Sequence, residues 1–340
     1  MTEFLAEYGL FLLKAVTIVG AVILIIGAGA AASRKASGRE SLDVESINKK
    51  YRSRAAVVKK AVLGKRDWKA QAKADKAREK AKAKADEKRP RSFVIDFRGD
   101  LKASAVQSLR EEVSAILEVA DESDQVILRL ENYGGVVHEH GLGASQLARI
   151  RDRNIPLIAT VDKVAASGGY LMACVANRII AAPFAILGSI GVIAQLPNFN
   201  RMLDSHGVDF EQITAGDYKR TVTMFGKNTD ADREKLKQEL DDVHNLFKSA
   251  VGRYRPGLDL KKVATGEHWY GTRALELGLA DELKTSDALL ADLARERDLY
   301  RVSYKVRKPL QKRLMGNIDD VLEKLDGARW RRRFESRLPR

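Results

Sequence analysis

The sequence has few of the residues that build disulfide bonds and metal centres. Its single cysteine, Cys174, excludes a disulfide bond within the chain and any cysteine-rich metal site. Cys174 lies in an apolar run, which favours a small buried side chain. The five histidines show no His-Glu-x-x-His spacing, and the chain has no internal repeat. We therefore expect one copy of a domain that needs no metal ion and no other cofactor.

Few basic side chains stand at the start of the chain, and acidic side chains outnumber basic ones at its centre. The net charge is +14, yet residues 92–300 hold 25 basic and 31 acidic side chains. The positive charge is concentrated in residues 34–91, with 21 basic and 8 acidic side chains, and in residues 301–340, with 13 and 5. A domain that binds nucleic acid would carry the positive charge itself, so the sequence argues against a nucleic-acid partner.

Residues 15–32 contain no charged side chain and, with the apolar residues 9–13, form a run long enough to cross about 30 Å of hydrocarbon as a helix. A cleaved signal peptide would need basic residues before this run, whereas only acidic ones stand there. We therefore expect a retained transmembrane helix over residues 1–33. Basic residues follow from Arg34 onward, so the positive-inside rule places the rest of the chain in the cytoplasm.

Residues 34–91 form a basic spacer rich in alanine and lysine. Between Trp68 and Arg89 the helix propensity is high but an apolar face is lacking, so this segment cannot bury a core. We expect a solvated helix or a disordered tether that ends at Pro90. Such a tract can lie on anionic lipid or serve only as a solubilising tether. The basic tail over residues 301–340 allows packing on the membrane or a neighbouring subunit, or a solvated tail.

From residue 92 to residue 300, short apolar runs alternate with segments of helical apolar spacing. This alternation predicts an α/β domain built from βα or ββα units. An uncharged run over residues 179–196 is interrupted by proline and glycine, so we expect it to be buried in the sheet and not in a membrane. The expected strands cover residues 93–97, 125–130, 157–161, 178–182 and 209–214, and the expected helices cover 103–120, 139–153, 230–254, 270–281 and 286–299.

One hydroxyl group stands among small residues at an expected strand-to-helix turn. Ser167 follows two alanines and precedes Gly168 and Gly169. Several unrelated hydrolases present a nucleophile at such a turn, with backbone N–H groups free beside it. The alternative is a tight glycine-rich turn in an α/β core. The motifs described next favour a nucleophile over this alternative.

Three further motifs supply partners for that hydroxyl. Asn-Tyr-Gly-Gly at 132–135 ends an expected strand, where bare backbone N–H groups can face a substrate oxygen. Gly-Ser-Ile-Gly-Val at 188–192 offers a second hydroxyl, and Gly-Asp-Tyr-Lys at 216–219 offers a lysine. No histidine stands in a comparable context. A lysine can then act as the base, because burial disfavours its ammonium form.

The order and spacing of these motifs resemble the signal peptide peptidase A family of Ser-Lys proteases over roughly residues 92–285. The segment over residues 265–281 is similar to that family's closing segment. The apolar N-terminal run and the charged spacer make the chain most similar to the SohB branch, which is assigned to the bacterial inner membrane. The loop over residues 132–135 departs from the family pattern, since it has Tyr133 in place of Ser-Pro and is one residue shorter.

This resemblance implies a ClpP/crotonase-like spiral of ββα units. It implies a membrane-anchored serine endopeptidase for peptide or protein substrates, including segments that resemble signal peptides or derive from membranes. Single-domain members form rings in which neighbours complete each active site, so a homo-oligomer is implied. The implied site has Ser167 as nucleophile, Lys219 as general base, Ser189 as the hydroxyl that positions the lysine, and the N–H groups of Gly168 and of Gly134 or Gly135 as the oxyanion hole.

Two other classes of function stay open on the sequence. A crotonase-like domain that binds acyl-CoA would use the same oxyanion geometry and need no nucleophile. A non-catalytic membrane scaffold would use the basic spacer and tail.

Overall fold

The structure is a computed structural model that describes residues 9, 13–14, 16–21, 41–84 and 89–305. The chain divides into two compact units, Met1–Asp43 with Tyr304–Arg340, and Val44–Ser303. The expected transmembrane helix over residues 1–33 and the basic tail over residues 301–340 lie mostly outside the described residues. Among the residues that are described, no helix has the length and apolar character needed to cross a membrane.

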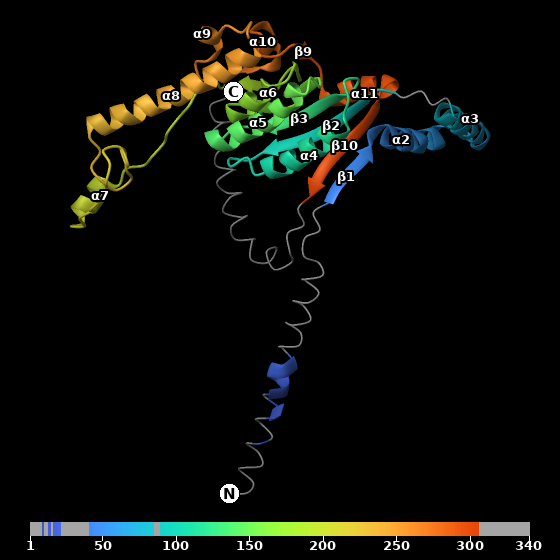
Figure 1. Ribbon diagram of the computed structural model, residues 1–340. Helices are drawn as coiled ribbons and strands as arrows, with labels where there is room; N and C mark the ends of the chain where they lie inside the picture. The colour runs from blue at the N-terminus through green and yellow to red at the C-terminus, as the bar shows by residue number, and fades with distance from the viewer. Residues whose placement is uncertain (1–8, 10–12, 15, 22–40, 85–88, 306–340) are drawn as a thin grey trace. The chain divides into compact units, whose positions relative to one another are not determined.

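A largely parallel sheet forms the centre of the second unit (Figure 1). Strand β4 is wholly buried, and β2 and β3 are buried over most of their length, which is typical of a sheet covered on both faces. This confirms the expected α/β class. In spatial order the strands are β1 (Ser41–Ser46), β10 (Asp298–Lys305), β2 (Arg91–Gly99), β3 (Gln125–Asn132), β4 (Leu157–Val161), β6 (Arg178–Ala181) and β9 (Glu282–Leu283).

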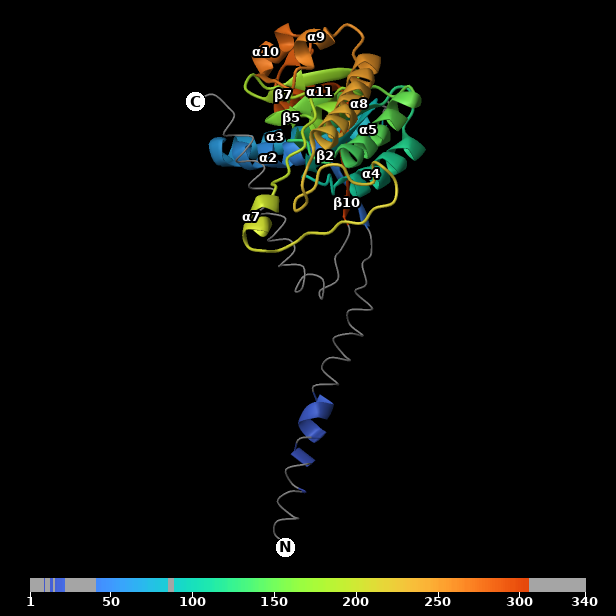
Figure 2. The ribbon, with the colours of Figure 1, turned by 90° about the vertical axis from the view of Figure 1, so that its left-hand side faces the viewer.

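Three short strands extend this sheet beyond the end of β3. Strand β5 (Val164–Ala166) pairs with β3 on one side and with β7 (Ile186–Gly188) on the other, and both pairs are parallel. Strand β8 (His268–Tyr270) pairs with β7 in the antiparallel direction. Figure 2 shows β5 and β7 next to each other. The extension therefore brings together chain segments that follow β3, β5 and β7.

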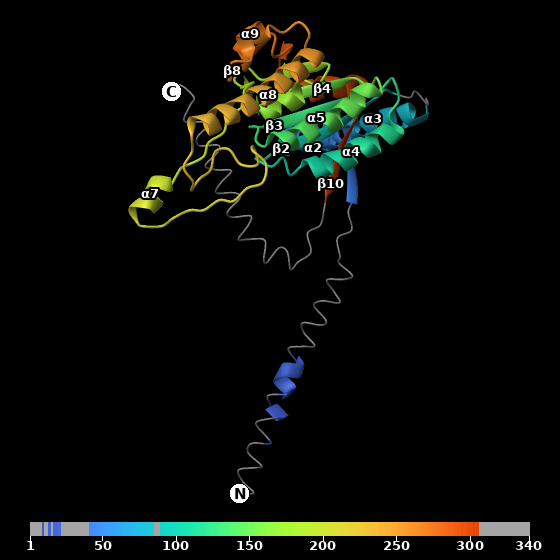
Figure 3. The same ribbon diagram turned by 60° about the vertical axis from the view of Figure 1, so that its left-hand side comes forward.

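Helices cover the two faces of the sheet unequally. Alternate residues of β2 point to opposite faces, so Phe93 and Ile95 join the larger core, whereas Val94 joins a smaller cluster. The larger core lies under α4 (Val106–Val119) and α5 (Val137–Asp152), which run side by side in Figure 3. The smaller cluster contains residues of α11 (Ser286–Glu296) and the start of α2 (Ile47–Val62). The short helices α6 (Gly168–Ala173), α9 (Leu260–Val263) and α10 (Gly271–Glu276) contribute to the larger core.

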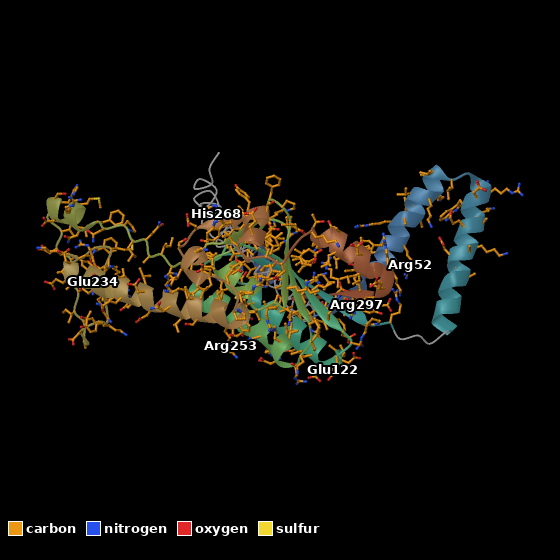
Figure 4. All side chains as sticks on the ribbon, turned by 90° about the horizontal axis from the view of Figure 1, so that it is seen from above. Arg52, Glu122, Glu234, Arg253, His268 and Arg297 are labelled. Carbon is orange, nitrogen blue, oxygen red and sulfur yellow. The ribbon has the colours of Figure 1, made fainter. Side chains whose placement is uncertain are left out.

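Residues 191–229, here termed the arm, leave the sheet after β7 and return through α8 (Asp230–Tyr254). The arm contains the short helix α7 (Asn200–Ser205) and lies beside the N-terminal part of α8, away from the sheet (Figure 1). Figure 4 labels Glu234 at this remote end of α8. Most side chains of the arm are exposed. Its aromatic rings contact one another, with Phe225 centred 6.0 Å from Phe199 and 5.8 Å from Phe210.

The basic spacer contains regular structure. Strand β1 joins the sheet, and the helices α2 (Ile47–Val62) and α3 (Lys65–Lys84) follow it. Of the two expected states, a solvated helix and a disordered tether, α3 is a helix over Lys65–Lys84. The first turn of α2 is instead docked, because Ile47 and Asn48 are buried against the smaller cluster. The compact unit therefore begins well before Ser92, where the sequence suggested that the domain starts.

Most expected elements agree with the structure, and three do not. The helix expected over residues 270–281 ends at Glu276, as α10. The strand expected over residues 209–214 is wrong, because these residues lie in the arm and pair with no strand of the described chain. The helix expected over residues 286–299 ends at Glu296, and β10 follows with Leu299 and Val302 buried. The uncharged run over 179–196 is mostly buried as far as Ile190, as expected, but Pro183 and Phe184 within it are exposed, and its end is exposed on the arm.

The Asn48 side chain joins the first turn of α2 to the C-terminal part of the unit. Its amide donates to the carbonyls of Ala294 and Arg297, both at 3.0 Å, and its Oδ1 accepts from the N–H of Leu299 at 2.7 Å. We expect Asn48→Ala to lower the free energy of unfolding by about 1–3 kcal/mol, because buried backbone groups lose their partners. Ser53→Ala, on the exposed face of α2, is the control and should change it by less than about 0.5 kcal/mol. Denaturant unfolding measures both, and equal effects would show that α2 is not anchored by Asn48.

Candidate functional site

Ser167 lies at a tight turn between β5 and α6. Its backbone has φ 52° and ψ −121°, a conformation that is costly for a residue with a side chain and that occurs mostly at functional sites. The turn is fixed on both sides, because Ser167 N–H donates to Gly188 O at 2.8 Å and its carbonyl accepts from Leu171 N–H at 3.0 Å. The side chain caps no backbone group of α6 and is half-buried. Its hydroxyl is therefore available to a substrate.

The glycine loop after β3 lies directly against this serine, as the sequence predicted. A side chain at Gly134, where φ is +85°, would place its Cβ 2.7 Å from Ser167 Cβ and 2.9 Å from Gly168 N. Gly134 N–H donates to Asn132 Oδ1 at 2.8 Å and is thus already occupied. The N–H of Gly135 donates to no hydrogen bond among the described residues. Gly168 is the first residue of α6, so its N–H has no acceptor inside that helix.

Ser189 stands beside Ser167 at the same end of two neighbouring strands. Ala166 at the end of β5 pairs with Gly188 at the end of β7, so the serine that follows each strand is adjacent to the other. Ser189 also has a positive φ of 53°, and its N–H donates to Glu267 O at 2.6 Å. The structure therefore places the backbones of the two serines that the sequence singled out side by side.

Lys219 is not brought to these serines within one chain. It lies on the arm and is exposed, and its backbone N–H donates to Gly216 O at 3.2 Å. Its side chain makes no hydrogen bond or ion pair with any residue that the structure describes. The neighbouring Tyr218 ring instead contacts Lys235 Nζ of α8, 4.7 Å from the ring centre. The burial that a lysine base needs is therefore absent from the single chain.

A histidine that the sequence analysis set aside lies behind the Ser167 turn. His140, in the first turn of α5, is completely buried. A side chain at Gly168 would place its Cβ 2.5 Å from the imidazole Cγ. The ring Nδ1 is 2.9 Å from Val136 O, and Nε2 is 3.2 Å from Asn132 Oδ1. The sequence motifs did not indicate this contact, although the helical spacing of His140 with Ala144 and Leu147 on the buried face could have signalled it.

Burial lowers the pKa of His140 below its usual range. The carbonyl of Val136 and the charges of Asp100 and Glu139 oppose this shift without overcoming it. The ring therefore favours the neutral state near neutral pH. Its interactions then depend on which nitrogen carries the proton.

Cys174 follows α6 and is buried, as expected. Burial raises the pKa of its thiol to about 12, so the thiolate needed for nucleophilic chemistry is disfavoured. Within the described ranges, no group of three or more His, Cys, Asp or Glu side chains is arranged to hold a metal ion.

The segment over residues 265–281 fixes α6 from the other side. Tyr170, completely buried in α6, donates its hydroxyl to Leu279 O at 3.1 Å. Arg255, just after α8, contacts both carboxylate oxygens of Asp281 at 2.7 Å, and Asp281 also accepts from Ile179 N–H at 2.7 Å. These bonds join the end of α8, β6 and the closing segment around the helix that Ser167 opens.

The chain matches two family models, "Peptidase family S49 N-terminal" over residues 3–147 and "Peptidase family S49" over residues 149–300. The chain belongs to peptidase family S49. It is 42% identical over 326 residues to "Probable protease SohB" of Haemophilus influenzae, with 92% of each chain covered. It is 45% identical over 298 residues to "Probable protease SohB" of Buchnera aphidicola subsp. Schlechtendalia chinensis, with 84% of this chain and 98% of that protein covered.

These matches confirm, at the level of the family, the resemblance stated from the motifs. This S49 member is a SohB-type peptidase. Among solved structures, the chain matches a mutant of the "1510-N membrane-bound stomatin-specific protease" with a TM-score of 0.41 and 14% identity, over 60% of this chain and 84% of that chain.

The ion pair between Arg255 and Asp281 makes the free energy of unfolding depend on pH. Burial alone would raise the pKa of the Asp281 carboxyl, but the hydrogen bonds from Arg255 and Ile179 N–H hold it below its usual range. At pH values above the unfolded-state pKa of ~3.9, ionised Asp281 therefore stabilises the fold. This contribution is lost as the pH falls through the lower folded-state pKa. We expect Asp281→Asn to lower the free energy of unfolding by about 2–4 kcal/mol at pH 7, and the difference from wild type to shrink below about pH 4.

Denaturant unfolding across this pH range measures the effect. Glu276→Gln is the control, because it removes an exposed ion pair with Arg273 and should cost less than about 0.5 kcal/mol. A difference between Asp281→Asn and wild type that is independent of pH would contradict the assigned ionisation.

Proposed function

We propose that the chain is a serine endopeptidase in which Ser167 is the nucleophile and Lys219, supplied by the arm of a neighbouring subunit, is the general base. The observation that carries this proposal is the strained Ser167 turn, with Gly134 directly against it and with the N–H groups of Gly135 and Gly168 donating to no partner among the described residues. A ClpP/crotonase-like arrangement of ββα units is part of the proposal, and the short strands β5, β7 and β8 support it.

The residues can divide the reaction between them in the usual way for acyl transfer. Ser167 Oγ attacks the scissile carbonyl while the neutral Lys219 amine accepts its proton. The N–H groups of Gly168 and Gly135 stabilise the oxyanion, and Gly134 is excluded because Asn132 already accepts from it. Lys219 then donates the proton to the leaving amine, and water hydrolyses the acyl-enzyme. The Ser189 hydroxyl, adjacent to Ser167, hydrogen-bonds the lysine and holds it in place.

The arm supports a shared site. Its apolar side chains are exposed in the single chain, with Ile213 at 95% and Tyr218 at 65%. A monomer would leave this surface in water, whereas a second copy of the chain could cover it. Burial between subunits would also favour the neutral amine of Lys219. A homo-oligomer thus accounts both for the exposed arm and for the separation of Lys219 from Ser167.

The uncharged run over residues 15–32 supports an anchor in the bacterial inner membrane, and the basic residues from Arg34 onward support a cytoplasmic catalytic domain. Substrates would then be peptide segments close to the membrane, including those that resemble signal peptides. With this topology, added protease should digest the domain in inverted membrane vesicles and leave it intact in right-side-out vesicles. The reverse pattern would place the domain outside the cytoplasm.

A pair of inactive variants tests the shared site. We expect Ser167→Ala and Lys219→Ala each to abolish peptide cleavage, because each lacks one half of the dyad. Co-expression of the two in equal amounts should restore about a quarter of the wild-type activity, since a quarter of the sites then combine an intact serine with a neighbour's intact lysine. Lys227→Ala, at another exposed lysine of the arm, is the control and should stay fully active.

Three outcomes would contradict parts of this proposal. Full activity of Lys219→Ala would exclude the dyad. Inactive mixtures of two folded, co-assembled variants would show that both groups come from one chain. A failure of a fluorophosphonate to label Ser167 in the wild type, with acyl-CoA bound instead, would favour the acyl-CoA-binding alternative.

A further inference from the structure

Two polar side chains lie fully buried behind the Ser167 turn and contact each other. Asn132 is the last residue of β3, and His140 is in the first turn of α5. The loop that approaches Ser167 runs between them in the sequence. Buried polar groups are costly unless they are paired, so each contact of this pair has an energetic consequence.

The orientation of the Asn132 amide is fixed by the backbone. Gly134 N–H can only donate, so the atom that it meets at 2.8 Å must be Oδ1. The amide nitrogen then lies 3.5 Å from Met172 Sδ, a weak acceptor. Oδ1 also faces His140 Nε2 at 3.2 Å. Because Oδ1 is an acceptor, a hydrogen bond between them requires the proton on Nε2. Val136 O, 2.9 Å from Nδ1, is also an acceptor, so the neutral ring can donate to only one of the two, and Val136 O already accepts from the backbone N–H of His140 at 3.2 Å.

Three glycines keep both side chains in place. A Cβ on Gly99 would lie 2.4 Å from Asn132 Cγ, and one on Gly169 would lie 2.3 Å from Asn132 O. A Cβ on Gly168 would lie 2.5 Å from the His140 ring. The chain thus has residues without side chains at each of these three points where the pair needs space.

We propose that His140 is a positioning residue of the peptidase: its Nε2–H holds Asn132 Oδ1, which holds Gly134 N–H, so that the loop presents Gly135 N–H beside Ser167. This inference rests on the proposed function, in which Gly135 contributes to the oxyanion hole. The bond from Gly134 to Asn132 forms a tight turn, and the positive φ of Gly134 brings the loop against Ser167. Without His140, Asn132 Oδ1 would keep Gly134 N–H as its one donor among these contacts.

Two amide substitutions distinguish the roles of the two ring nitrogens of His140. The side-chain nitrogen of His140→Gln can reach the position of Nε2, whereas that of His140→Asn can reach only the position of Nδ1. We expect His140→Gln to keep kcat for peptide cleavage within about threefold of wild type. His140→Asn should lower kcat by about 10- to 100-fold with KM unchanged within about twofold, because the oxyanion donor is misplaced. Equal losses of kcat in the two variants, or losses that follow only the fall in Tm, would overturn the proposal.

A measurement on the full-length wild-type chain keeps the proposal testable if His140→Asn does not fold. In protein labelled with ¹⁵N-histidine, NMR should find the His140 proton on Nε2 near neutral pH, and a neutral ring protonated only on Nδ1 would overturn the assignment.

Hydrogen exchange of the Gly134 amide is the second measurement. The exchange should be slow in wild type and in His140→Gln. In His140→Asn it should be at least tenfold faster, on the order expected for a lost hydrogen bond. Equal exchange in the two variants would also overturn it. These two readouts need no activity, so they separate a failure of this inference from a failure of the proposed function.

Discussion

The arrangement of the site depends on the backbone pairing of the three-residue strand β5. On one side Ala165 pairs with Asn132 at the end of β3, and on the other Ala166 pairs with Gly188 at the end of β7. These bonds place the glycine loop, Ser167 and the residue after Gly188 at one end of three adjacent strands. A shift of β5 by one residue would turn its side chains to the opposite face and separate the hydroxyl groups.

The sequence predicts the long elements well because their periodicity is strong. Helix α8 has the predicted limits, Asp230 and Tyr254, and the apolar run of β4 has the predicted limits, Leu157 and Val161. Short strands such as β5 contain too few residues to show a period. For residues 209–214 the sequence predicts a strand where the structure has none. Their β-branched and apolar residues fit a strand, but no partner strand lies beside them in the described chain.

The site is predictable where a local motif defines it and unpredictable where distant residues do. Ser167 and its glycines form a recognisable turn within one stretch of chain. His140 forms no motif, since its role arises from Gly99 and Gly168, which are distant in sequence and leave space for the Asn132–His140 pair. The position of Lys219 relative to Ser167 could not be predicted either, because it is not determined by contacts within one chain.

Strand β10 has a consequence for the order of folding during synthesis. It lies between β1 and β2 in the sheet, although it is made of residues 298–305. Strand β1 and the first turn of α2 therefore find their partners only after almost the whole described chain has left the ribosome. Until then the early part of the compact unit has a vacant sheet edge along β2, which is open to pairing with other chains. A nascent chain of this protein thus has reason to need a chaperone until its C-terminal strand is made.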